Sequence, residues 1–249
     1  NCSRLPPSRC CTPASIDRQK IPSQVSFELP VTGIDGCTFC SIIEGGTEAK
    51  WESRPTGDSL VSCFHNRLKW ARVMLLIVPT QHLTQHELWS SDVLIDAARL
   101  ALEMGDKHCG EEGYRAISNF GLQAHQSQPH AHIHIVSGTS KQLQSAVQQS
   151  SLDGSELTSV AEYGVDESPF AASIAPKTAM SQRELWSSEQ ILETSRQALN
   201  TAERQSPNGF RLMSNFEPSI TSNPGQNQAP GENPASLFLL GGGQLGLYV

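Results

Sequence analysis

The sequence predicts an α+β protein built on an antiparallel meander sheet with helices, and it predicts that this unit occurs twice in tandem. Three observations lead to this prediction: an internal repeat, a short apolar run that ends at a proline, and apolar residues at helical spacing after it. The 249 residues are 37% hydrophobic and 17% charged, which is apolar enough for a buried core.

The repeat is visible in two separate motifs that keep nearly the same spacing. The sequence QHELWSS at residues 85–91 recurs as QRELWSS at residues 182–188. A glycine, an aromatic residue and arginine, followed by Ser-Asn-Phe, occur at residues 113–120 and again at 209–216. We therefore divide the chain into a flexible N-terminal arm (1–35), a first copy (36–143), a Gln- and Ser-rich linker (144–155) and a second copy (156–249).

Each copy is expected to contain the same elements in the same order. In the first copy these are a buried strand at 75–78 that ends at Pro79, a helix capped by Ser91 with its apolar face at 93–104, a strand at 114–118, a polar loop at 119–128 and a strand at 130–136. Gly110 ends the helix. The second copy closes with a strand and turn at 237–243. Trp89 of the first copy and Trp186 of the second hold equivalent positions. Because the second copy lacks the histidines of the first, this favours a packing role for both.

Three histidines, His130, His132 and His134, alternate along the last strand of the first copy. Because successive strand residues point to opposite faces, they share one face, while Ala131, Ile133 and Ile135 point into the core. The second copy contains no histidine. Aligning Pro129 with Pro234 places Ala235, Leu237 and Leu239 opposite the three histidines, so the second copy is expected to keep the shape and to lack the reactive groups.

The three imidazoles alone allow more than one chemistry. An imidazole can attack phosphorus through one ring nitrogen when its other nitrogen is held by an acceptor. Gln126 and Ser127, in the preceding loop, are donors suited to phosphate oxygens. Alternating histidines also bind metal ions, or form a solvated patch. The strand by itself does not separate phosphate chemistry from metal binding.

Charge and cysteine content limit the class of protein. A net charge of −7 argues against a general nucleic-acid binder, and no apolar run approaches the length of a membrane helix. Seven cysteines, an odd number, fit a reducing compartment better than a disulfide framework. We expect a cytoplasmic protein, with a plastid or another organelle as the alternative if the arm is the remnant of a transit peptide.

Several motifs together resemble the histidine-triad (HIT) family. The run His-Ala-His-Ile-His-Ile-Val at 130–136 matches the family pattern in which histidines alternate with hydrophobic residues. The resemblance covers about residues 37–143. It also includes the Cys-x-x-Cys segment at 37–43, the strand at 76–79 followed by His82, Asn-Phe-Gly at 119–121, and Gln126-Ser127.

The resemblance implies a hydrolase that breaks a bond at the α-phosphorus of a purine nucleotide or other nucleoside phosphate. His132 is then the nucleophile that forms a nucleotidyl-histidine, and His130 and His134 orient it and contact phosphate. By the same resemblance, Asn119, Gln126 and Ser127 lie near the phosphates, and Asn66 contacts the ribose. A third histidine, rather than glutamine, resembles the Hint-like hydrolase branch, with nucleoside phosphoramidases and dinucleoside polyphosphate hydrolases as the expected activities.

Two departures from the family pattern keep other functions open. Asn66 stands where many members have aspartate, and Met74 where many have a further histidine. The alternative is therefore a nucleotide-binding or scaffold protein with little catalytic activity. A third hypothesis is a metal-binding protein that uses the triad itself.

The resemblance also implies a metal site and an assembly. Some HIT proteins have a structural zinc site made of a Cys-x-x-Cys pair, a histidine after the buried strand and the first triad histidine. The matching residues are Cys37, Cys40, His82 and His130. Members commonly pair two copies across a two-fold axis, so this chain is expected to form an internal pseudo-dimer and to be monomeric.

Overall fold

The computed structural model describes residues 34–140, 147–164, 168, 170–218 and 235–242. The first part contains α1 (Thr38–Ile43), β1 (Trp51–Ser53), β2 (Val61–His65), β3 (Met74–Pro79), α2 (Gln85–Ser90), α3 (Val93–Cys109), β4 (Tyr114–Phe120), the 3-10 turn η1 (Leu122–Ala124) and β5 (Ile133–Ser137). The second part contains β6 (Val147–Leu152), β7 (Thr158–Gly164), β8 (Phe170–Pro176), α5 (Gln182–Ser187), α6 (Gln190–Gln205), β9 (Phe210–Phe216) and β10 (Leu237–Gly241). Nearly all of the predicted arm lies outside the described residues.

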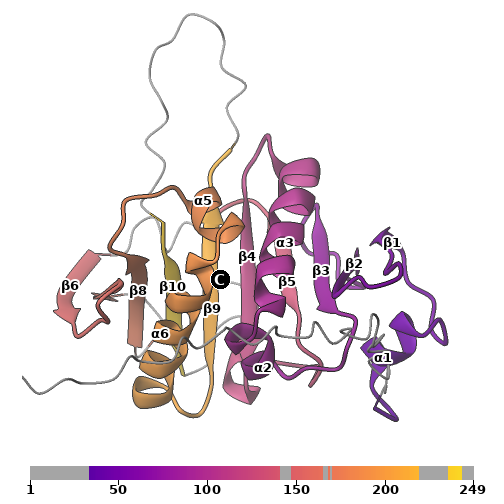
Figure 1. Cartoon of the computed structure of the whole chain (residues 1–249), viewed down its shortest axis with the longest axis horizontal. Coiled ribbons are helices and arrows are strands. Elements are labelled where there is room, and N and C mark those ends of the chain that lie inside the picture. Colours follow the sequence, from indigo (N-terminus) through magenta and orange to yellow (C-terminus); the bar gives the residue numbers. More distant parts are fainter. Residues whose placement is uncertain (1–33, 141–146, 165–167, 169, 219–234, 243–249) are drawn as a thin grey trace, which may run out of the picture. The chain divides into compact units, whose positions relative to one another are not determined.

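These strands form one antiparallel sheet in the order β1-β2-β3-β5-β4-β9-β10-β8-β7-β6 (Figure 1). Helices α3 and α6 pack against the sheet on the same face, each over the strands of its own part of the chain. The predicted α+β class with an antiparallel sheet is confirmed. None of the helices in the described ranges combines the length and the apolar composition that a bilayer crossing requires.

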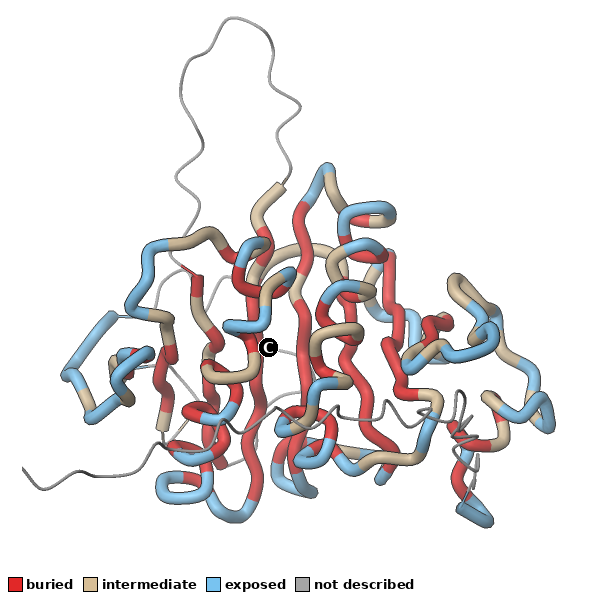
Figure 2. The backbone as a smooth tube through the Cα atoms, viewed as in Figure 1, coloured by how far each residue is buried: buried red, intermediate tan, exposed pale blue. Residues whose placement is uncertain are grey.

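Strands β4 and β9 join the two parts of the sheet at its centre. They pair from Tyr114 opposite Phe216 to Phe120 opposite Phe210, and each of these aromatic pairs is stacked, with ring centroids 4.5 and 4.2 Å apart. Figure 2 shows that these central strands are mostly buried. The two parts therefore share one continuous core rather than a solvated boundary.

The repeated tryptophans are packing residues, as predicted. Trp89 and Trp186 are both 1% exposed, and their rings meet edge to face at 6.2 Å. The Trp89 Nε1 donates a hydrogen bond to Ser118 of β4, and the Trp186 Nε1 donates one to Ser214 of β9, each 3.1 Å long. The polar atom of each buried ring is thus satisfied within its own part of the chain.

Short helices α2 and α5 begin at capping boxes that the repeat contains. The Thr84 hydroxyl accepts from Glu87 N, and the Glu87 carboxylate accepts from Thr84 N; Ser181 and Glu184 repeat both bonds. The predicted Ser91 cap is wrong, because the Ser91 hydroxyl donates to Leu88 O at the end of α2. The long helix instead starts after Asp92, and it ends at Gly110 as predicted.

The histidine strand is shorter than predicted. Strand β5 begins at Ile133, paired with Ile77, and residues 130–132 precede it. The main chain of these residues forms hydrogen bonds outside the sheet: Ala131 N donates to Leu83 O, and His132 N donates to the Gln85 side chain. Strand β4 continues through Asn119 and Phe120, which the sequence had placed in the loop. Ala131, Ile133 and Ile135 lie in the main core, as predicted.

Residues 147–152 of the predicted linker are a strand. They form β6 at the edge of the sheet, paired with β7, and most of their side chains are exposed. Exposure explains why the Gln- and Ser-rich sequence resembles a loop. The closing strand of the second part is confirmed as β10, and residues 243–249 lie outside the described ranges.

The expected alignment of the two parts is wrong by one residue. Ala235 N donates to Met180 O as Ala131 N does to Leu83 O, and Ser236 N donates to Gln182 as His132 N does to Gln85. Phe238 pairs with Met213 as His134 pairs with Ile117. Ser236 and Phe238 therefore stand where His132 and His134 do, whereas Leu237 and Leu239 face the core.

Candidate functional site

A cavity of about 950 Å³ lies between α1, the strands β2 and β3, and the histidine segment. It brings together four of the predicted site residues: Asn66, Ser127, His132 and His134. The basic side chains Lys50, Arg67, Lys69 and Arg72 also line it, together with one carboxylate, Glu48. Arg72 is paired with Glu112, so three basic groups that have no ion pair among the described residues outnumber that carboxylate, which favours an anionic ligand in a chain that is acidic overall. Its volume is that of a typical small-molecule site.

The imidazole of His132 is held in one tautomer. Its Nδ1 lies 2.9 Å from His130 O, and because a carbonyl only accepts, Nδ1 must carry the proton. The lone pair is then on Nε2. Burial lowers the pKa of His132 from its ordinary value, partly offset by this hydrogen bond, so the ring is neutral near pH 7. A neutral ring with a free Nε2 is the nucleophilic form.

Two residues that the sequence analysis missed hold the main chain of His132. Gln85 donates from Nε2 to His132 O at 2.8 Å and accepts at Oε1 from His132 N at 3.3 Å. The Ser118 hydroxyl also donates to His132 O, at 3.2 Å. Both residues belong to the repeated motifs, so their recurrence with Gln182 and Ser214 was the available signal.

Aromatic and imidazole rings fix the position of the His132 ring. Phe39 of α1 meets it edge to face at 5.3 Å, and His134 meets it at 4.8 Å. His134 is 4% exposed, and burial, with smaller contributions from His132 and Arg211, holds its pKa well below the usual range. Both rings are thus neutral and rigidly packed.

Three of the predicted ligand-contacting residues make other hydrogen bonds. Asn119 is buried and its Oδ1 accepts from Arg211 Nε at 2.8 Å. Gln126 accepts from Gly121 N and donates to Gln128 O, which closes the loop before the histidines. Asn66 lines the cavity while its Oδ1 accepts from Leu68 N. Of the three, only Asn66 lines the cavity.

Cys37, Cys40, His82 and His130 form a cluster that could hold a metal ion. One ligand atom from each lies within 4.8 Å of the others. His130 Nε2 is 3.0 Å from Pro79 O, so that nitrogen carries the proton and Nδ1 faces Cys40 Sγ at 3.4 Å. Two thiols and two imidazoles in closed arrangement fit a tetrahedral metal site.

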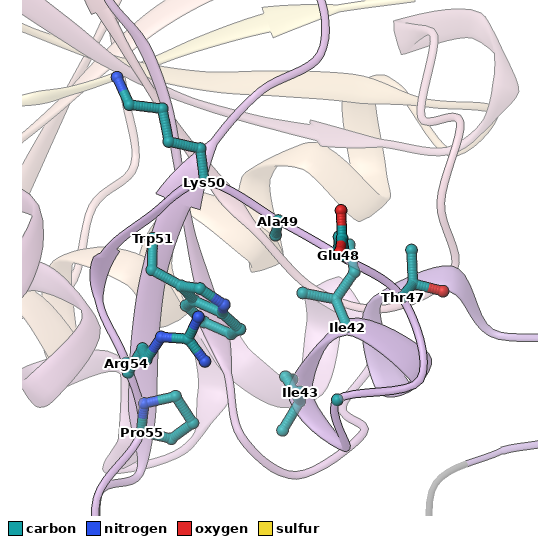
Figure 3. Close-up of a pocket in the computed structure, with 10 residues that line it drawn as sticks. Ile42, Ile43, Thr47, Glu48, Ala49, Lys50, Trp51, Arg54 and Pro55 are labelled. Atoms are coloured by element: carbon teal, nitrogen blue, oxygen red, sulfur yellow. The ribbon is translucent and has the colours of Figure 1, made fainter.

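A second cavity of about 610 Å³ adjoins the first and shares Ile42, Glu48, Ala49 and Lys50 with it. Figure 3 shows the Arg54 guanidinium lying against the Trp51 indole, and its carbon is 5.3 Å from the ring centroid. This contact is a cation–π pair that closes one wall of the cavity.

A charged cluster beside the cavity ties the edge strand β1 to α3. Glu52 contacts His65 Nε2 at 2.7 Å, His108 Nε2 at 2.9 Å and Lys107 Nζ at 3.2 Å. These groups, led by the hydrogen bond from His65, lower the pKa of Glu52 to about 2. The sequence analysis missed this cluster, because its members are far apart along the chain.

A family model and two relatives match part of this chain. A family model described as the HIT domain matches residues 56–141. An uncharacterized HIT-like protein of Chlamydia muridarum is 32% identical over 103 residues, which cover 40% of this chain and 79% of that protein. An uncharacterized HIT-like protein of Chlamydia trachomatis is 31% identical over 103 residues, covering 40% of this chain and 90% of that protein.

Two solved structures resemble a larger share of the chain. A GALT-like protein from Arabidopsis thaliana covers 85% of this chain and 82% of its own, with 13% identity and a TM-score of 0.55. An ADP-glucose phosphorylase from Arabidopsis thaliana with bound ADP-glucose covers 88% and 83%, with 13% identity and a TM-score of 0.57. These two show the fold alone. On the strength of the Chlamydia relatives and the matching domain model, the chain belongs to the HIT family.

Proposed function

We propose that this protein is a nucleotide-binding hydrolase that cleaves at the α-phosphorus of a nucleoside phosphoramidate or a related nucleoside phosphate. The observation that carries the proposal is the His132 ring, whose Nδ1 is held by His130 O and whose position borders a cavity lined by basic side chains. His132 is the nucleophile, and His130 and His134 orient it. Asn66 and Ser127 contact the nucleotide, while Asn119 and Gln126 support the strand and the loop beside the site.

The reaction proceeds in two displacements at phosphorus. The lone pair of His132 Nε2 forms a bond to the α-phosphorus as the bond from phosphorus to the leaving amine breaks, and the amine takes a proton from water. Water then attacks the same phosphorus, the bond to Nε2 breaks, and the water proton leaves to solvent. Throughout, Nδ1 keeps its proton against His130 O, which stabilises positive charge on the ring.

Zinc is the metal that we propose for Cys37, Cys40, His82 and His130. The fit rests on the donor set and on the His130 tautomer, which leaves Nδ1 as the ligand atom. A bound zinc ion would supply structure rather than chemistry, since all four positions are filled by protein. Its effect on the site would be to hold α1, and with it Phe39, against the histidine segment.

We also propose that the chain is an internal pseudo-dimer, with a HIT domain at 36–143 and a degenerate HIT-like domain at 156–249. Three features support this: the mirrored strand order about β4 and β9, the two capping boxes, and the recurring bonds that Gln85 and Gln182 accept from the main chain. Strand β9 of the second domain pairs with β4 of the first. Without it, β4 would be an edge strand with unpaired backbone groups.

The activity is tested with purified protein and adenosine 5′-phosphoramidate. The native chain is expected to release AMP, and His132→Ala is expected to lose at least about a thousand-fold in kcat. The control is His125→Asn, because His125 is exposed and has a φ of 58°, a region that asparagine tolerates. Equal inactivity of the native and His132→Ala proteins on phosphoramidates and dinucleoside polyphosphates would overturn the proposal.

A second candidate is a nucleotide-binding or scaffold protein with little turnover. Met74, 5% exposed, forms part of the cavity wall at the position where the family resemblance leads one to expect another histidine. Tight binding of AMP by calorimetry together with no AMP release would favour this candidate over the hydrolase.

A further inference from the structure

A third cavity, of about 750 Å³, lies in the second part of the chain and is not used by the proposed reaction. We call it the distal pocket. Its walls come from β6, β7, β8 and β10, and its lining includes Asp153, Tyr163, Ser173, Lys177, Ser236 and Phe238. All of its lining residues belong to the described part of the chain.

The distal pocket occupies the place in the second part that the histidine cavity occupies in the first. Ser236 and Phe238 stand where His132 and His134 do, as the recurring hydrogen bonds show. Counted back from Pro79 and Pro176, Ser173 stands where Leu76 does, and Leu76 lines the histidine cavity. The pocket therefore has an equivalent framework with different side chains on its walls.

Those side chains remove the chemistry of the histidine cavity. The lining contains no imidazole and no thiol, and its titratable groups are Asp153, Tyr163 and Lys177. The Lys177 ammonium already donates to Ser155 O at 2.8 Å. With one partnered cation and one carboxylate, the pocket has little to attract a phosphate, and it has no neutral nitrogen nucleophile.

What the pocket offers instead is hydroxyl groups beside aromatic rings. Among the described residues, neither the Ser173 nor the Ser236 hydroxyl has a hydrogen-bond partner, so both are available to a ligand. Tyr163 and Phe238 lie 5.4 Å apart at a tilt of 55° on the same wall. Sugars combine hydroxyl groups that bond to such side chains with C–H faces that pack on aromatic rings.

We propose that the distal pocket binds a neutral saccharide of one or two sugar units without cleaving it. The volume is suited to a ligand of that size. Ser173 and Ser236 bond to sugar hydroxyls, and the neighbouring rings of Phe238 and Tyr163 pack on the sugar face. This proposal does not depend on hydrolysis at His132, because the two cavities share no lining residue.

The test is saturation-transfer NMR with glucose, galactose and maltose on the full chain. At least one sugar is expected to give a signal with the native protein and with His132→Ala, and saturating AMP is expected not to displace it. Ser173→Leu restores the residue found at the equivalent position of the first part, so it fills the pocket within a packing that the fold tolerates. It is expected to weaken binding at least ten-fold and to leave AMP release unchanged.

A second variant keeps the test valid if Ser173→Leu does not fold. Phe238→Ala removes the half-buried ring, and it is expected to abolish the signal while circular dichroism shows a folded chain. The proposal is overturned if none of the sugars gives a signal, if AMP displaces the sugar, or if both folded variants bind it like the native chain. Adenosine binding there in place of any sugar also overturns it.

Discussion

At the scale of single residues, the reactivity of His132 is set by main-chain geometry rather than by a neighbouring carboxylate. The acceptor for Nδ1 is the carbonyl of His130, two residues earlier in the same segment. That carbonyl is correctly placed only if residues 130–132 keep their conformation ahead of β5. Gln85 and Ser118 maintain it, because both bond to His132 O.

Gln85 is therefore predicted to be a positioning residue. Gln85→Leu removes both bonds to the main chain of His132, and it is expected to lower kcat about 10- to 100-fold while KM changes little, since misplacing a reacting group by 1 Å has effects of this size. Steady-state kinetics on adenosine 5′-phosphoramidate, corrected for the folded fraction, measures the split between kcat and KM.

The chain contains its own control for this prediction. Gln182 accepts the corresponding bond from Ser236 N, and its Nε2 donates to the Ser214 hydroxyl rather than to a main-chain carbonyl. Gln182→Leu should lower the melting temperature by a similar amount and leave kcat unchanged. An equal loss of kcat in the two variants would show that Gln85 acts only through stability.

At the scale of elements, α1 depends on contacts beyond its own six residues. A helix this short is not stable alone. Its Cys40 faces His130 and His82, and its Phe39 packs on the His132 ring. A metal ion in the Cys37–Cys40–His82–His130 cluster would fix the helix to the histidine segment.

We predict one zinc ion per chain in protein purified from zinc-containing medium. Cys40→Ser is expected to lose the zinc and to lower both the melting temperature and the activity, whereas His134→Ala and Cys109→Ala are expected to keep it. Plasma emission spectroscopy gives the zinc content. Zinc retained by Cys40→Ser but lost by His134→Ala would mean that the triad itself holds the metal.

The edge strand β1 is held to α3 through Glu52, and this contact depends on pH. The folded-state pKa of Glu52 is about 2, below its ordinary value of 4.5. Its contribution to stability is therefore present above pH 4.5 and is lost as the pH falls toward 2.

Glu52→Gln is predicted to flatten the pH dependence of the free energy of unfolding between pH 4.5 and 2. Urea unfolding at several pH values measures it, with the exposed Glu103→Gln as the control. A native slope that Glu52→Gln leaves unchanged in this range would show that Glu52 does not couple β1 to α3.

At the scale of the whole molecule, the second part of the chain contributes to the first through the central strands. Arg211 of β9 is fully buried and donates to Asn119 of β4, and its charge acts on His134. The β4–β9 ladder and its two stacked aromatic pairs join the two parts of the chain, and in the proposed pseudo-dimer they form the internal interface.

The chain is accordingly predicted to be a monomer of 27.0 kDa in solution. Light scattering coupled to size-exclusion chromatography gives the mass directly. A stable dimer at micromolar concentration would mean that another face, outside the β4–β9 ladder, associates.

The sequence predicted structure well where residues repeat or alternate. It predicted structure less well where a side chain, rather than a neighbouring strand, forms the hydrogen bonds of the main chain. The repeat identified the tryptophans as packing residues, and the alternation of histidines identified the face of His132 and His134. The helices α2 and α5, which lie in the repeated motif, were not predicted. Neither the repeat nor the alternation could reveal that Gln85 takes the place of a strand partner, and the start of β5 was therefore placed too early. The second part has one residue fewer between its proline and Ala235 than the first part has between Pro129 and Ala131, which also could not be seen. Leu237 was therefore aligned with His132 in place of Ser236.

The most direct test of the account is to trap the covalent intermediate. Native protein is mixed with adenosine 5′-phosphoramidate, quenched within milliseconds at alkaline pH, digested and examined by mass spectrometry. The account predicts an adenylyl group on the peptide that contains His132, absent from His132→Ala and present in His125→Asn. An adenylyl group on any other residue, or AMP release by His132→Ala at the native rate, would contradict it.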